Sequence, residues 1–148
     1  MSPTLSELEQ LLPDSSILLS VVALSRDDAI RQAGDLLVAA GSVEPDYVVE
    51  MLGRERAVST FVGEGIAMPH GTLTAKSDVL VEGLSLLRLA EPVDWGGEPV
   101  TIVIGIAAHG RRYITLLSQL ATALLDEGRA EALRSTDSVD QVRRILSS

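Results

Sequence analysis

Val100-Thr101-Ile102-Val103-Ile104-Gly105-Ile106-Ala107-Ala108 is the stretch that decides the fold of this chain. A continuous Val/Ile run of this length, interrupted by one glycine, is typical of a strand buried on both faces. Upstream, residues 91–99 contain Trp95-Gly96-Gly97 and predict a loop or hairpin, and residues 78–89 predict a further strand. Downstream, residues 113–125 repeat apolar side chains at helical spacing. We therefore expect a buried strand followed by a helix that packs on its sheet.

The remaining segments add strands and helices on both sides of this strand. Strands are predicted at residues 16–22 and 64–68, and helices at residues 6–12, 25–40, 44–56, 128–134 and 138–146. Ser25 and Ser138 are the expected N-caps, and Gly41 is an expected C-terminal cap. The pattern predicts one α/β domain, a mixed β-sheet flanked by helices, over residues 11–148. Residues 1–10 are expected to be partly helical or loose.

The composition indicates an acidic globular protein with an aliphatic core. Hydrophobic residues make up 46% of the 148 residues and aromatic residues only 3%, with a mean hydropathy of +0.26, which excludes a disordered chain. The formal net charge of −9 argues against nucleic acid or an anionic membrane surface as a partner. Such a charge suits docking to a basic patch of another protein, or serves solubility alone.

Neither a membrane span nor a secretion signal is expected. The longest apolar runs, residues 17–24 and 102–108, are far shorter than the ~17–25 residues of a spanning helix. The N-terminal Met1-Ser2-Pro3-Thr4 has no basic region followed by an apolar one. The chain has no cysteine, so neither a disulfide framework nor thiol chemistry is expected in it. These features predict a cytoplasmic protein without direct membrane insertion.

The strongest chemical candidate is His70, which stands in the segment Gly63–Thr72 at the end of a predicted strand. It is one of two histidines in the chain. Pro69 fixes its own φ and lacks a donor, while Gly71 permits close backbone approach. Such a turn suits an imidazole that is held at a strand end with one ring nitrogen free to react.

Other groups offer less specific signals. His109 also follows a buried strand, so it either shares a cleft with His70 or is a solvated loop residue. Arg54, at the end of a predicted helix, either clamps an anion or lies on a solvated face. No metal-ligand spacing and no glycine-rich phosphate loop is present in the sequence, so no metal or other cofactor is predicted.

The run Gly63–Thr72, preceded by Met51-Leu52-Gly53-Arg54-Glu55-Arg56, resembles the enzyme IIA domain of the mannitol/fructose class. These domains, of type 2, belong to the bacterial phosphoenolpyruvate-dependent sugar phosphotransferase system. The similarity extends from about Leu11 to Leu146, and three segments look like the mannitol branch. They are residues 43–48, 104–108 and 136–140.

By this resemblance, His70 accepts a phosphoryl group on Nε2 from the histidine-containing phosphocarrier protein. It then passes the group to a cysteine of an enzyme IIB domain, for uptake of a sugar or sugar alcohol through a membrane IIC component. The resemblance also implies that the other ring nitrogen donates a hydrogen bond and that Arg54 neutralises the phosphate. The acceptor of that hydrogen bond cannot be identified from the sequence.

The chain departs from the family pattern at one position. Mannitol-type members carry a second active-site histidine where this chain has Tyr113. Either the Tyr113 hydroxyl takes the role of that imidazole, or His109 reaches in from the preceding loop, or transfer is altered. Thr72 and Glu64 are further candidates for stabilising the phosphate.

Two alternative functions fit the same resemblance. One is a regulatory protein like the nitrogen-related enzyme IIA proteins, in which the phosphorylation state gates binding to other proteins. The other is an interaction domain that has lost phosphotransfer, which the missing second histidine would support. The mannitol-like segments favour the transport role over the regulatory one.

Overall fold

The structure is a computed structural model that describes residues 10–72, 78–108 and 110–147. Its strands are β1 (Ile17–Val21), β2 (Phe61–Gly63), β3 (Ile66–Ala67), β4 (Gly83–Trp95) and β5 (Glu98–Ala107). After a short 3₁₀ turn at Asp14–Ser16, the helices are α2 (Arg26–Ala39), α3 (Asp46–Ala57), α4 (Gly110–Leu124), α5 (Glu127–Ser135) and α6 (Val139–Ser147). Most of the predicted N-terminal segment and of the helix at 6–12 lies outside the described residues.

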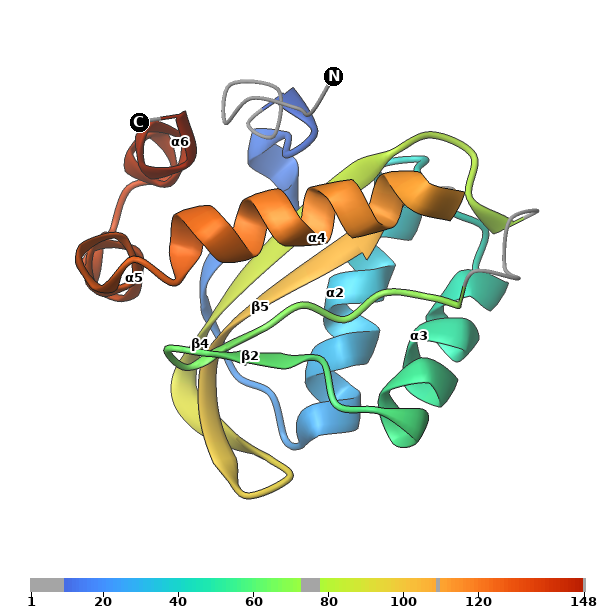
Figure 1. The fold of residues 1–148 in the computed structure, drawn as a ribbon, viewed down its shortest axis with the longest axis horizontal. Coiled ribbons are helices and arrows are strands. Elements are labelled where there is room, and N and C mark those ends of the chain that lie inside the picture. The colour runs from blue at the N-terminus through green and yellow to red at the C-terminus, as the bar shows by residue number, and fades with distance from the viewer. Residues whose placement is uncertain (1–9, 73–77, 109, 148) are drawn as a thin grey trace.

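The strands form one mixed five-stranded sheet in the order β1-β4-β5-β3-β2. β1 runs parallel to β4 and β3 parallel to β5, whereas β4–β5 and β2–β3 are antiparallel. Helices α2 and α3 cover one face of the sheet, and α4, α5 and α6 cover the other (Figure 1). The predicted mixed sheet flanked by helices in a single domain is confirmed.

The buried strand β5 contributes side chains to a hydrophobic core on each face of the sheet. Ile102, Ile104 and Ile106 pack under α4, α5 and α6, while Val103 and Ala107 pack against α2 and α3. Because successive side chains of a strand point to opposite faces, a continuous apolar run is required where both faces are covered. The prediction from the Val100–Ala108 run is therefore confirmed.

The structure contains the helix caps predicted at Ser25, Gly41 and Ser138. The Ser25 hydroxyl accepts the Asp28 N–H at the start of α2. After α2, Gly41 has a φ of 80°, and the Ser42 N–H donates to the Leu37 carbonyl, as in a Schellman motif. The Ser138 hydroxyl accepts the Gln141 N–H at the start of α6.

Two predicted strands were wrong in their bounds. The strand predicted at 78–89 begins at Gly83 and continues to Trp95, as one arm of a hairpin that turns at Gly96-Gly97. Residues 78–80 leave the sheet because their backbone pairs with Ser42, Val43 and Glu44, next to the end of α2.

The strand predicted at 64–68 is in fact a small hairpin. β2 was not predicted, and Glu64 and Gly65 form the tight turn before β3, with φ values of 54° and 72°. Glycine adopts this left-handed region without steric cost, whereas for glutamate it is uncommon.

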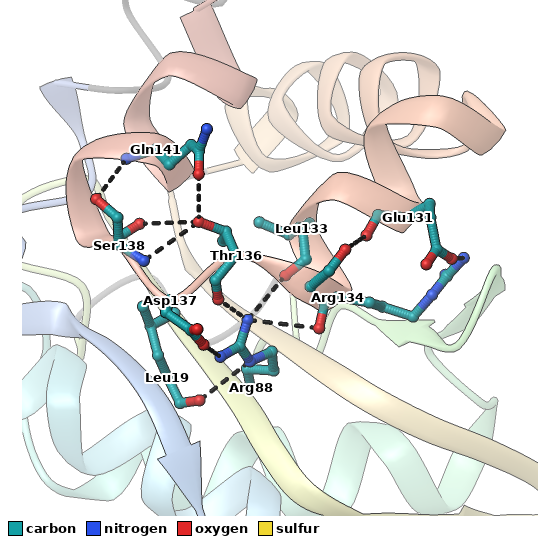
Figure 2. A network of polar contacts seen from close by, with 10 residues as sticks. Leu19, Arg88, Glu131, Leu133, Arg134, Thr136, Asp137, Ser138 and Gln141 are labelled. Carbon is teal, nitrogen blue, oxygen red and sulfur yellow. Dashed lines mark hydrogen bonds and ion pairs between the residues drawn. The ribbon is translucent and has the colours of Figure 1, made fainter.

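Arg88 on β4 links the connection between α5 and α6 to the sheet through hydrogen bonds (Figure 2). Its guanidinium donates to carbonyl oxygens of Leu19, Leu133, Arg134 and Thr136 and to the Asp137 carboxylate. The carbonyls of Leu133, Arg134 and Thr136, at the end of α5, would otherwise lack partners within their helix. The contact seats α5 on the face of the sheet opposite α2 and α3.

Candidate functional site

The site lies where the chain leaves β3 alongside the carboxyl end of β5. β3 and β5 run in parallel register, Ile66 beside Ile102, and the pairing continues to an isolated bridge between His70 and Ile106. The Ile106 N–H donates to the Pro69 carbonyl at 3.0 Å. The parallel pairing therefore brings His70 to the end of the sheet at which β5 leads into α4. His109, the other candidate histidine, lies outside the described residues.

The His70 ring is held in one tautomer. Its Nδ1 lies 2.9 Å from the Met68 carbonyl oxygen, which only accepts hydrogen bonds, so Nδ1 carries the proton. Nε2 is buried and has no hydrogen-bond partner among the described residues. Since the residue as a whole is 3% exposed, the lone pair of Nε2 lies in a position protected from solvent.

The surroundings of His70 favour its neutral form. Burial lowers the pKa of His70 below its usual 6.5, and the nearby Arg54 guanidinium lowers it further. The hydrogen bond to Met68 and the charge of Glu55 oppose this shift but do not reverse it. The imidazole is therefore a neutral nucleophile at pH 7.

We expect the NMR titration of the His70 ring to have its midpoint below pH 6.5. Below that pH the unfolded chain binds a proton at this residue more readily than the folded chain does, so acidification removes stability. The free energy of unfolding should therefore fall as the pH drops from about 6.5, and His70→Gln should lose this part of the pH dependence. A titration midpoint above pH 6.5 would contradict this assignment.

Tyr47 on α3 clamps the turn that carries His70. Its buried hydroxyl accepts the Gly71 N–H at 2.8 Å and donates to the Ile106 carbonyl at 2.8 Å. Burial raises the pKa of Tyr47 to about 12, so the hydroxyl keeps the proton that it donates. A Cβ on Gly71 would lie 2.5 Å from the Tyr47 ring, so glycine is required for this approach.

Glu55, also on α3, holds the segment on the other side of His70. Its carboxylate accepts the Thr60 N–H at 2.8 Å, the Thr60 hydroxyl and the Trp95 Nε1–H at 3.1 Å. The Thr60 carbonyl in turn accepts the Met68 N–H at 3.0 Å. The backbone that presents the Met68 carbonyl to His70 is thus tied to α3.

Arg54 and Tyr113 lie close to the imidazole. The Arg54 guanidinium, near enough to lower the pKa of His70, donates to the Val58 carbonyl at 2.7 Å. A guanidinium carries five N–H groups, so this bond leaves donors for an anion. The Tyr113 ring, at the start of α4, has its centroid 5.0 Å from that of His70, tilted by 32°.

The other two candidates differ in their positions. Thr72, two residues beyond His70, donates its hydroxyl to Glu50 at 2.9 Å. Glu64 lies toward the other end of β5, because its neighbour Gly65 bonds to Thr101 whereas His70 pairs with Ile106. Glu64 instead pairs with Arg134 of α5. The structure therefore does not bring Glu64 to His70.

Sequence reasoning did not identify Tyr47 and Glu55 as members of this site. Tyr47, Met51 and Glu55 are spaced by four residues and all lie on the buried side of α3. A glutamate in line with the apolar residues of a helix is the signal that could have identified Glu55.

Among the described residues, no group of three or more His, Cys, Asp or Glu is arranged to hold a metal ion. In the same residues, no helix is long and apolar enough to cross a membrane.

Comparisons with known proteins place this arrangement in a family. The family model of the "Phosphoenolpyruvate-dependent sugar phosphotransferase system, EIIA 2" matches residues 10–148. The mannitol-specific phosphotransferase enzyme IIA component of Staphylococcus aureus strain MRSA252 is 38% identical over 139 residues, which are 94% of this chain and 96% of the relative.

Two solved structures have the same fold. The crystal structure of IIA mannitol from Escherichia coli has a TM-score of 0.85 and 42% identity, covering 90% of this chain and 97% of that one. Enzyme IIA mannitol of E. coli, solved by NMR in complex with phosphorylated enzyme IIB mannitol, has a TM-score of 0.85 and 39% identity, covering 93% and 99%. The resemblance predicted from the sequence is thus confirmed, and the chain belongs to the type-2 enzyme IIA family, the phosphotransferase relay components of the phosphoenolpyruvate-dependent sugar phosphotransferase system.

Proposed function

We propose that this chain is the IIA step of a mannitol-type relay in which Nε2 of His70 carries the phosphoryl group. The observation that carries the proposal is the ring itself: Nδ1 is hydrogen-bonded to the Met68 carbonyl, and Nε2 is buried and has no partner in the described part of the chain. A neutral imidazole with a free Nε2 lone pair is a competent nucleophile near pH 7.

The chemistry consists of two displacements at phosphorus. In the first, the bond from phosphorus to the donor's histidine nitrogen breaks, its electron pair returns to the donor ring, and Nε2 of His70 forms the new bond. In the second, a cysteine thiolate attacks phosphorus, and the electron pair of the N–P bond returns to Nε2. Such transfers depend mostly on positioning and charge stabilisation, which Arg54 supplies to the phosphoryl oxygens.

The partners follow from the relatives and from the charge. The E. coli relative in complex with phosphorylated enzyme IIB supports a IIB domain as acceptor, and the names of the relatives support mannitol as the transported sugar alcohol. The histidine-containing phosphocarrier protein is the donor, and a membrane IIC component uses the phosphoryl group downstream. The net charge of −9 suits docking to basic protein surfaces in the cytoplasm.

Tyr113 takes the position of the family's second histidine. Its ring is a neighbour of His70, and its hydroxyl is the only polar group it can offer to a phosphoryl oxygen. Thr72, beside the Glu50 carboxylate, supports the turn after His70. In this proposal Tyr113, and not His109, assists transfer.

A reconstituted relay tests the function. Phosphoenolpyruvate labelled with ³²P, enzyme I and the phosphocarrier protein should label the wild-type chain, and a mannitol IIB domain should then remove the label to its cysteine. Tyr113→Phe, which keeps the ring and removes the hydroxyl, should slow labelling about 100- to 1,000-fold, the range for loss of one stabilising donor. His109→Gln should label at close to the wild-type rate.

The same assay separates the alternatives. A chain that is labelled but never passes the label to IIB would contradict the transport role and support the regulatory one. A chain that takes up no label would indicate an interaction domain without phosphotransfer. If His109→Gln is slow and Tyr113→Phe is not, the role assigned to Tyr113 belongs to His109.

A further inference from the structure

Glu55 is a charged side chain in an unusual place. It lies on the buried side of α3 and is 3% exposed. Glutamate is almost never fully buried unless it is paired, because removing its charge from water is energetically costly. Among the residues that the structure describes, no Lys, Arg or His forms an ion pair with this carboxylate.

Three hydrogen bonds hold the Glu55 carboxylate, and they come from two different parts of the fold. Thr60 donates twice, from its backbone N–H and its hydroxyl, and Trp95 donates its indole N–H from the end of β4. The carboxylate therefore joins α3, the chain before β2 and the β4–β5 hairpin at one point. Charge-assisted hydrogen bonds of this kind are stronger and shorter than neutral ones.

The position of this junction matters because it leads directly to His70. Thr60 accepts the Met68 N–H through its carbonyl, and Met68 accepts the His70 Nδ1–H through its own carbonyl. This path from the junction to the imidazole runs through backbone atoms of Thr60 and Met68. A shift of Glu55 would therefore move the acceptor that fixes the His70 ring.

We propose that Glu55 is a positioning residue for phosphoryl transfer at His70, acting through Thr60 and Met68 and through its negative charge. This inference rests on the proposed function of His70. When Nε2 forms the bond to phosphorus while Nδ1 keeps its proton, the ring becomes an imidazolium beside a negatively charged phosphoryl group. A buried carboxylate favours the positive ring, and Arg54, the preceding residue, favours the negative phosphoryl oxygens. In the unphosphorylated protein the two charges already act on the imidazole in opposite directions.

Glu55→Gln is the decisive variant because it keeps the shape of the side chain and removes its charge. In the ³²P relay we expect labelling of His70 to slow on the order of 10- to 100-fold, as for other small misplacements of a reacting group. We also expect the NMR titration of the His70 ring to move to lower pH, because the charge that raises its pKa is gone. A role confined to holding the backbone, in which the Glu55 charge does not act on the ring, would not move that titration. Glu131→Gln, an exposed residue of α5, is the matched control and should leave both measurements unchanged.

A folded Glu55→Gln with wild-type labelling, or one that labels slowly with an unchanged His70 titration, overturns the proposal. If Glu55→Gln does not fold, Thr60→Val is tested in its place. Valine removes the hydroxyl that donates to the Glu55 carboxylate and keeps the backbone N–H that also donates to it. Wild-type labelling of Thr60→Val would then overturn the proposal. Labelling of the wild type in the same experiment shows that the relay function stands, so failure of the role of Glu55 is distinguished from failure of the function.

Discussion

Replacing His70 with glutamine should abolish phosphorylation of this chain by the phosphocarrier protein. Glutamine has no nitrogen lone pair that can act as a nucleophile near neutral pH, so Nε2 has no substitute in the site. Glutamine can still place its amide N–H toward the Met68 carbonyl that holds the histidine ring. We therefore expect a folded protein with no acid-labile phosphate after incubation with labelled phosphoenolpyruvate, enzyme I and the carrier.

The control is the unfolding curve of the same variant at pH 7.5, where a neutral His70 contributes no protonation difference between folded and unfolded chains. A stability close to that of the wild type shows that the loss is chemical. Retention of histidine-bound phosphate in His70→Gln would move the phosphorylation site to His109 and contradict the assignment.

Gly71→Ala should damage both folding and transfer, because the new methyl group has no room. Its Cβ would lie 2.5 Å from Cε1 and 2.8 Å from Cζ of Tyr47. The Tyr47 ring cannot move aside without breaking its two hydrogen bonds, to the Gly71 N–H and the Ile106 carbonyl. We expect a loss of about 1–3 kcal/mol in the free energy of unfolding, the usual cost of overpacking. Labelling of His70 should slow as well, since the turn that carries the ring is displaced.

Gly53→Ala is the matched control for this substitution. Gly53 lies on α3, and among the described residues a Cβ there would meet no atom within 4 Å beyond its chain neighbours and its own helix backbone. Alanine is favoured over glycine inside a helix by about 1 kcal/mol, so this variant should be more stable than the wild type. Urea unfolding of both variants and the relay assay measure the two effects. A Gly71→Ala protein with wild-type stability and labelling would show that the Tyr47 clamp does not constrain the turn.

The sequence identified the features that depend on local pattern. The apolar run Val100–Ala108 predicts a strand buried on both faces, because only such a strand needs apolar side chains at consecutive positions. The caps at Ser25 and Ser138 follow from side chains that satisfy helix N–H groups a few residues away. His70 was identified from its immediate neighbours, Pro69 and Gly71.

Features that depend on contacts between distant segments could not be predicted. Residues 78–80 look like a strand, but their backbone bonds to Ser42 and Glu44 instead of entering the sheet. Glu55 receives a hydrogen bond from Trp95, 40 residues away, and Tyr47 bonds to Ile106, 59 residues away. The hydrogen bond to Nδ1 of His70 comes from a backbone carbonyl, which every residue possesses and which no side-chain pattern therefore reveals.

Phosphorylation at Nε2 of His70 is the step on which the proposed relay depends. The most direct measurement is ¹H–¹⁵N and ³¹P NMR of the ¹⁵N-histidine-labelled protein after phosphorylation by the carrier. We predict coupling of phosphorus to Nε2 of His70, with Nδ1 still protonated and hydrogen-bonded to Met68. Phosphorus coupled to Nδ1 of His70, or to a nitrogen of His109, would contradict phosphorylation at Nε2 of His70.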